Sequence, residues 1–153
     1  MMKRVIGLNY FNLFFVEYKK ARKELLNDTQ GSLVWSNLLK FANTKRKTYS
    51  RNTKNNEPVV QISKEIFKKE LKILKPDYII FAVSYTYDKV IKEFFEDEIT
   101  DSNVIEPKSL WKFKIGNTIC YRTWHPSTIK YTAQKDKLEY YKDIITDIKL
   151  SNA

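Results

Sequence analysis

The stretch from Tyr78 to Val83 constrains the fold of this chain more than any other segment. It is a continuous run of aromatic and aliphatic residues. A strand with one face in solvent alternates polar and apolar residues, whereas a continuous apolar run is typical of a strand covered on both faces. The sequence therefore predicts a buried strand here, with other elements packed against each of its faces.

Four segments have the apolar spacing of an amphipathic helix. Apolar residues recur at steps of three and four, which predicts helices over roughly residues 10–26, 63–74, 87–97 and 132–149. The expected N-cap of the second helix is Ser63. The residues of the last three helices that are expected to face the core are Ile66, Phe67, Leu71, Leu74, Val90, Ile91, Phe94, Phe95, Leu138, Tyr141, Ile145 and Ile148.

Further strands are predicted on either side of this run. The stretch SLVWSNLLKF is strongly apolar at its start and predicts a buried strand that ends near Ser36 and Asn37. The stretch WKFKIGNTICYRTW alternates around Gly116 and Asn117, which predicts a hairpin. Because helices and strands alternate, the expected class is α/β. We expect one domain over residues 1–153, a three-layer sandwich with a short, largely parallel central sheet flanked by helices.

The chain is strongly basic. It has 28 Lys and Arg against 18 Asp and Glu, a net charge of +10, and such a surplus favours a polyanionic partner. Residues 43–56 carry five basic residues, no acidic residue and no apolar period, which predicts an exposed loop. A general surplus that serves solubility is the alternative explanation of the charge.

Several classes of protein are disfavoured by the sequence. The single cysteine, Cys120, excludes an internal disulfide and a multi-cysteine metal site, and it suits a cytoplasmic protein. No stretch is long and apolar enough to predict a membrane span, and no secretory leader is expected, since Asn9 and Asn12 interrupt the first apolar run. No phosphate-binding glycine loop or second histidine is present, so neither a cofactor nor a metal is expected. The acidic residues from Glu96 to Asp101 are interpreted as a solvated turn.

Polar residues follow the predicted strands where ligands of parallel α/β sheets usually bind. These clusters are Ser36-Asn37, Ser84-Tyr85 and the stretch from His125 to Ser127. An Asn amide both donates and accepts, so Asn37 could read the edge of a base, and a neutral His125 could donate to an oxygen that gains charge. The alternatives are structural: a histidine beside Trp and Pro is most often packed, and Asn37 could cap a strand end.

Three stretches, VWSNLLKF, LKPDYIIFAVS and RTWHPSTIK, resemble the uracil-DNA glycosylase superfamily over about residues 33–150. The resemblance implies that Asn37 reads the uracil edge and that His125 stabilises the charge developing on the uracil carbonyl. It also implies that Ser127 contacts the DNA backbone and that Ile129 is the apolar wedge that enters the stack as the base leaves. The basic residues expected to contact phosphates are Lys40, Lys45, Arg46, Lys47, Arg51 and Lys130.

The N-terminal region departs from this family. The family's first motif is a Gly-rich loop with a water-positioning carboxylate or Asn and a stacking aromatic, well before the Asn strand. Only 36 residues precede Asn37, and VIGLNYF at 5–11 offers Asn9 for the water and Tyr10 or Phe11 for stacking. Our preferred interpretation is that the domain lacks the family's first strand and loop. A homodimer or another segment would then cover the exposed sheet edge.

Three functional hypotheses follow from these observations. The first is a DNA-directed hydrolase of the N-glycosidic bond of uracil or a related base. The second is a catalytically degenerate protein of the same fold that binds single- or double-stranded DNA. The third is an α/β domain whose basic surface meets a protein or an anionic metabolite. Base preference, strand preference and biological pathway stay open at this point.

Overall fold

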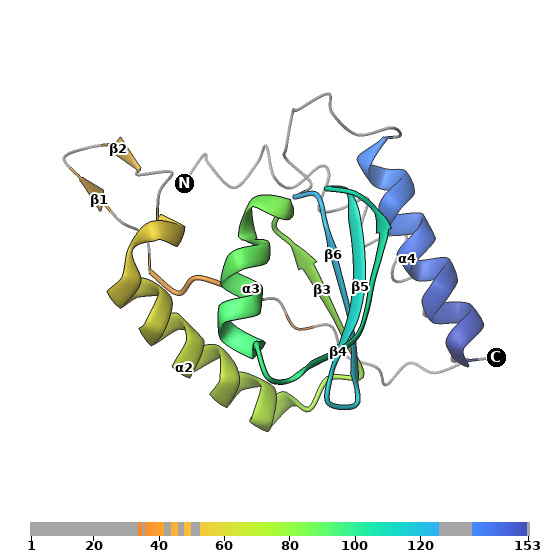
Figure 1. The fold of residues 1–153 in the computed structure, drawn as a ribbon, viewed down its shortest axis with the longest axis horizontal. Helices are drawn as coiled ribbons and strands as arrows, with labels where there is room; N and C mark the ends of the chain where they lie inside the picture. Colours follow the sequence, from red (N-terminus) through yellow and green to blue (C-terminus); the bar gives the residue numbers. More distant parts are fainter. Residues whose placement is uncertain are drawn as a thin grey trace.

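The computed structural model describes residues 34, 36–41, 44–45, 48–49, 53–125 and 136–152. Within them, a four-stranded sheet lies between helices on both of its faces (Figure 1). The strands are β3 (Tyr78–Ala82), β4 (Ile99–Glu106), β5 (Leu110–Ile115) and β6 (Thr118–Thr123), in the spatial order β3-β6-β5-β4. The α/β class predicted from the sequence is therefore confirmed.

The sheet is mixed, so the prediction of a largely parallel sheet is wrong. β3 pairs with β6 in parallel, whereas β6 with β5 and β5 with β4 pair antiparallel. The reason lies in the connections, because residues 107–109 and 116–117 form tight turns that cannot carry a parallel crossover. The predicted hairpin is confirmed, and Gly116 takes the left-handed φ of 58° that its turn requires.

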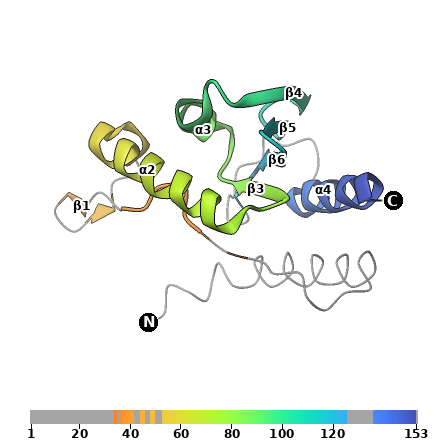
Figure 2. The same ribbon diagram turned by 90° about the horizontal axis from the view of Figure 1, so that it is seen from below.

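In the described part of the chain, three α-helices flank the sheet. They are α2 (Glu57–Leu74), α3 (Asp88–Phe95) and α4 (Lys137–Asn152). Figure 2 shows the strands running from β4 to β3, with α2 and α3 on one side and α4 on the other. The burial of β3 predicted from its apolar sequence thus arises from helices on both faces of the sheet.

Alternation along the strands divides the interior into two main cores. The core towards α2 and α3 includes Leu38, Val60, Phe67, Phe81, Val90, Ile91, Phe94, Phe95, Trp111, Phe113, Ile115 and Cys120. The core towards α4 includes Leu110, Tyr121, Trp124, Tyr140, Ile144 and Ile148. The residues predicted to be buried in α3 are all in the first core, whereas Leu74 of α2 is 44% exposed.

Helix α2 begins earlier than the sequence pattern indicates. Pro58 lies in its first turn, where a missing backbone N–H costs nothing, so the helix extends back to Glu57. The prediction of Ser63 as N-cap is wrong, because Ser63 lies within the helix and is fully buried. Its Oγ accepts a hydrogen bond from the backbone N–H of Lys40 at 2.9 Å.

The described residues of SLVWSNLLKF do not form the predicted strand. No strand is assigned at Val34 or over residues 36–41, and the Val34 side chain is 54% exposed. The segment lies against α2 instead, where the Lys40 ammonium meets Glu70 at 2.6 Å and Leu38 enters the core. Burial acts to raise the pKa of Glu70, but hydrogen bonds from Lys40 and Ser36 outweigh it and lower that pKa.

Strand β4 was not predicted, and it forms one edge of the sheet. Most of its residues are exposed, including Val104 and Ile105. Its pairing with β5 shifts register twice, and Asp101 has a left-handed φ of 47°. Within the acidic stretch, Glu96 and Asp97 are exposed, as predicted for a solvated turn.

The basic stretch 43–56 contains only short elements in its described residues. These are β1 (Thr44–Lys45), β2 (Thr48–Tyr49) and the 3₁₀ turn η1 (Thr53–Asn55). The predicted helix over 10–26 and the start of the predicted helix over 132–149 lie outside the described residues. The described part of the last helix matches the prediction, with Tyr141, Ile145 and Ile148 buried.

Candidate functional site

The carboxyl ends of β3 and β6 lie side by side, because these two strands are parallel neighbours. The backbone N–H of Ser84, just after β3, donates to the carbonyl of Thr123 at the end of β6 over 3.0 Å. This bond brings Ser84 and Tyr85 next to Trp124 and His125. Ser84, Tyr85 and His125, which belong to two of the three polar clusters noted in the sequence, therefore lie at one edge of the sheet, where ligands of parallel strands bind.

Aromatic rings and lysines gather at this edge. Tyr85 is 37% exposed and meets the Trp124 ring edge to face, with centroids 5.8 Å apart. The Lys108 ammonium lies 5.6 Å from the centroid of the Tyr85 ring, and Lys54 lies 5.3 Å from that of Tyr87. Such cation–π contacts hold a positive charge beside an aromatic face. We call these five residues the aromatic edge.

The turn that presents Tyr85 is strained. Ser84 has φ 70° and ψ 162°, a backbone conformation that residues with a side chain rarely adopt. Its carbonyl accepts from the N–H of Tyr87 at 3.2 Å, and its Oγ shares a hydrogen bond of 3.0 Å with Thr86 Oγ1. Strain of this kind persists only where the surroundings fix the backbone, so Tyr85 is held in one position.

An ion pair between Arg122 and Asp88 contacts the turn that carries Lys108 of the aromatic edge. Arg122 on β6 is 2% exposed, and its Nε and Nη2 donate to the two carboxylate oxygens of Asp88 at 2.6 and 3.0 Å. Its Nη1 donates to the carbonyl of Lys108 at 2.9 Å. Arg122 therefore links the start of α3 to the turn that carries Lys108. Burial raises the pKa of Asp88, and the guanidinium of Arg122 opposes that rise.

Two buried polar atoms at this end of β6 have no hydrogen-bond partner among the residues that the structure describes. They are Thr123 Oγ1 and Trp124 Nε1. The carbonyl of Trp124 is satisfied, because it accepts from the Tyr141 hydroxyl at 2.6 Å and so ties this edge to α4. Unpaired buried polar groups are uncommon in folded proteins and cost stability.

His125 follows Trp124 directly and is partly exposed at this edge. Cys120, five residues earlier, is fully buried in the core towards α2 and α3. Burial raises the pKa of its thiol to about 12, so the thiolate is not formed at neutral pH. Cys120 is therefore not a nucleophile available to this edge of the sheet.

The other predicted site residues are distributed as follows. Asn37 is exposed, but it lies on the segment beside α2 and not at a strand end. Lys40 is 11% exposed on its side chain and is engaged by Glu70, which favours a structural role. Lys45 lies in β1, and its side chain is not described. The predictions for Asn9, Tyr10, Phe11, Arg46, Lys47, Arg51, Ser127, Ile129 and Lys130 fall outside the described residues and stay predictions.

Sequence reasoning missed part of this site. It noted Ser84 and Tyr85 at a strand end, but it did not single out Tyr87, Lys54 or Lys108. The stretch YTY directly after a buried strand was an available signal. Lys108 was not, because it lies in the turn between β5 and the unpredicted strand β4.

Known proteins give no further guide to this site. No family model, curated protein or solved structure matches the chain. In the described part of the chain, no group of three His, Cys, Asp or Glu residues could hold a metal ion. Among the helices that the structure describes, none has the length and apolar character needed to cross a bilayer. The residues of the aromatic edge therefore carry the functional assignment.

Proposed function

We propose that this protein binds single-stranded DNA by stacking an unpaired base on Tyr85 at the carboxyl edge of β3 and β6. The observation that carries the proposal is the exposed Tyr85 ring, which is supported by Trp124 and has the Lys108 ammonium beside it. Proteins that bind single strands combine an aromatic ring for each stacked base with cations that follow the phosphates.

The setting of the ring explains the choice of ligand. The edge-to-face contact with Trp124 and the strained turn at Ser84 fix the ring before binding, so little conformational entropy is lost on stacking. Lys54 and Lys108 supply positive charge at the same edge. The net charge of +10 adds a longer-range attraction for polyanions. A paired base is already stacked in its duplex, so an unpaired base is the better partner.

The test is fluorescence anisotropy with a labelled oligothymidylate. Stacking of one base on an aromatic ring is worth about 1–3 kcal/mol, so Tyr85→Ala should weaken binding about tenfold or more. Tyr85→Phe keeps the ring and should bind nearly as the wild type does. Phe41→Ala removes another exposed ring, 49% exposed on the segment beside α2, and should change little.

Salt dependence gives a second measurement of the same proposal. Phosphate contacts release counterions, so the affinity should fall steeply between about 50 and 200 mM salt. An affinity that is flat over this range, or one that Tyr85→Ala leaves unchanged, would contradict the proposal. Binding of duplex in preference to single strands would also contradict it.

His125 favours a second candidate function, the excision of uracil from DNA. The histidine follows Trp124, the residue that contacts the proposed base-stacking ring, and the resemblance to uracil-DNA glycosylases gives its counterpart the role of stabilising charge on the uracil carbonyl. A positioned donor of this kind contributes to the rate because it is strongest when the oxygen becomes negative. The base would have to leave the stack first, and stacking on Tyr85 would favour that.

Release of free uracil from a single-stranded oligonucleotide tests this second candidate. The wild type should release uracil, and His125→Ala should lower the rate by about 10²-fold or more. Oligonucleotide binding by His125→Ala, measured in parallel, separates lost catalysis from lost affinity. If the wild type and His125→Ala release uracil at the same background rate, the enzymatic candidate fails while the binding proposal stands.

A further inference from the structure

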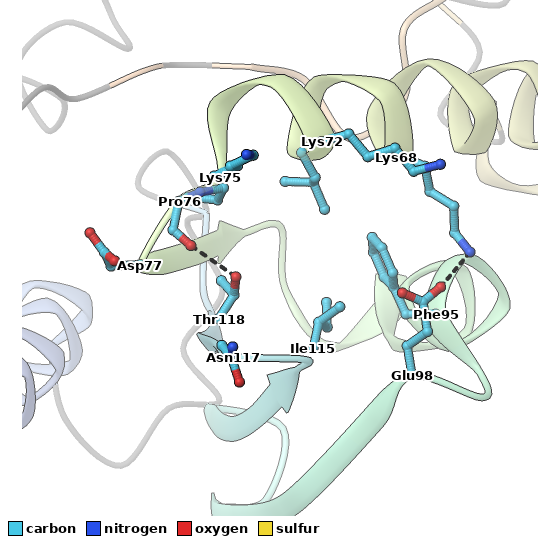
Figure 3. A pocket seen from close by; sticks show the side chains of 11 residues that line it. Lys68, Lys72, Lys75, Pro76, Asp77, Phe95, Glu98, Ile115, Asn117 and Thr118 are labelled. Carbon is cyan, nitrogen blue, oxygen red and sulfur yellow. Dashed lines mark hydrogen bonds and ion pairs between the residues drawn. The ribbon is translucent and has the colours of Figure 1, made fainter.

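A hollow lies at the end of β3 and β6 opposite the aromatic edge, where both strands begin (Figure 3). It has a volume of about 620 Å³ and lies between the C-terminal half of α2, the end of α3 and the turn from β5 to β6. This size falls within the range of pockets that enclose small organic molecules. The hollow shares no residue with the aromatic edge.

Part of the wall of this hollow is apolar, and the rest is formed by charged and polar side chains. Leu71 of α2, Phe95 of α3 and Ile115 of β5 line it, and all three also pack in the core towards α2 and α3. Phe95 and Ile115 are almost fully covered already, at 1% and 8% exposure, so a ligand with an apolar body would bury mainly its own apolar surface and that of the partly exposed Leu71. That burial is the main source of affinity for small apolar groups.

Two of the side chains that line the hollow already have a polar partner within the protein. Lys68 Nζ pairs with Glu98 Oε1 at 2.6 Å, and Thr118 Oγ1 donates to the carbonyl of Pro76 at 2.8 Å. Figure 3 shows these two contacts on different sides of the hollow. Lys68 and Thr118 therefore do not need a ligand as a polar partner. They also leave Asp77, which is exposed, as the one lining carboxylate of the described residues that lacks an ion pair.

The rim of the hollow carries two cations. Lys72 and Lys75 are exposed, and within the described part of the chain neither ammonium has a hydrogen bond or an ion pair. Lys75 adopts a left-handed conformation at the end of α2, with φ 44°. The last turn of a helix leaves carbonyl groups that repel anions, so an anion here would depend on these ammonium groups. Asn117 adds an amide on the facing turn.

We infer that this hollow binds a small organic anion with an apolar body, such as a medium-chain carboxylate. The hydrocarbon part would lie against Leu71, Phe95 and Ile115, and the carboxylate would meet Lys72 and Lys75. The inference does not depend on DNA binding, because the two sites lie at opposite ends of the parallel strand pair. It assigns to the protein a second ligand of a different chemical class.

Isothermal titration of the full chain with octanoate tests the inference. Octanoate should bind, while acetate, which lacks the apolar body, and 1-octanol, which lacks the charge, should bind at least about tenfold more weakly. The double variant Lys72→Gln with Lys75→Gln should weaken octanoate binding about tenfold. A matched control is Lys64→Gln with Lys69→Gln, which removes the same charge from α2 outside the hollow and should leave the affinity unchanged.

Three results would overturn the inference. The first is no binding of octanoate by the folded wild type. The second is equal weakening by the two double variants, which would show that only net charge matters. The third is loss of octanoate binding in Tyr85→Ala, which would place the ligand at the aromatic edge. Retention of octanoate binding by Tyr85→Ala supports two independent sites, whatever that variant does to DNA binding.

Discussion

Asp88→Asn lowers the free energy of unfolding by about 3–5 kcal/mol, because it leaves a buried guanidinium without its partner charge. Arg122 is 2% exposed, and its Nε and Nη2 donate hydrogen bonds to the two oxygens of this one carboxylate. Asn has nearly the size of Asp, so no cavity forms, and the loss of stability measures the effect of removing the carboxylate charge. Urea denaturation followed by circular dichroism measures the change.

An exposed ion pair provides the control for this prediction. Asp101 and Lys114 meet at 2.7 Å, but their side chains are 66% and 44% exposed. Asp101→Asn should therefore change the unfolding free energy by less than about 1 kcal/mol. Combining Asp88→Leu with Arg122→Met removes both charges of the pair and should recover much of the stability. Equal losses for Asp88→Asn and Asp101→Asn would mean that burial does not govern this pair.

Phe67→Ala destabilises the protein by about 3–5 kcal/mol, the usual cost of removing a buried phenyl ring. Phe67 is one of the α2 residues that are buried in the core. Its ring centroid lies 6.1 Å from that of Phe81 on β3, and 6.3 and 6.0 Å from those of Phe94 and Phe95 on α3. Its removal opens a cavity shared by two helices and the sheet. The same denaturation experiment measures the loss.

Ile73→Ala is the matched substitution on the same helix. The Ile73 side chain is 80% exposed, so its truncation leaves no cavity and should change the free energy of unfolding by about 0.5 kcal/mol or less. Ala also favours the helical conformation, which works in the same direction for both variants. A loss at Phe67 no larger than that at Ile73 would show that α2 is not held by its ring contacts.

The elements that sequence patterns located well are those whose burial follows from local spacing. In α3, residues at helical steps are buried as expected, and β3 coincides with the apolar run. The Gly116 turn was recognisable because it demands a left-handed backbone. In each case a few neighbouring residues decide the conformation, so the sequence pattern contains the information.

Strand direction and the strand β4 were not predictable in this way. Helices alternating with strands indicate parallel pairing, but the short turns after β4 and β5 make these strands antiparallel. The residues of β4 are mostly polar and exposed, so the sequence did not indicate this strand. The antiparallel order of β4, β5 and β6 could therefore not be predicted. Likewise, Asn37 follows an apolar stretch that resembles a strand, yet its neighbour Leu38 is buried against other elements without forming one.

Only the residues of the candidate site that follow strand ends could be predicted from the sequence. His125 and Tyr85 could be expected at one edge once β3 and β6 were taken as parallel neighbours. The contacts that shape the edge come from distant parts of the chain: Arg122 meets Asp88 across 34 positions of sequence. Such pairs depend on how the helices lie on the sheet, and a single sequence does not show that.

The irregular edge at β4 has a consequence for the behaviour of the protein in concentrated solution. An exposed outer strand with apolar residues, here Val104 and Ile105 at 55% and 50% exposure, is a template for aggregation. Two register shifts and the left-handed Asp101 interrupt the regular row of N–H and C=O groups that an incoming strand would need. The charged pair of Asp101 and Lys114 adds polar groups at the same place. This edge therefore resists the strand-by-strand growth that leads to fibrils.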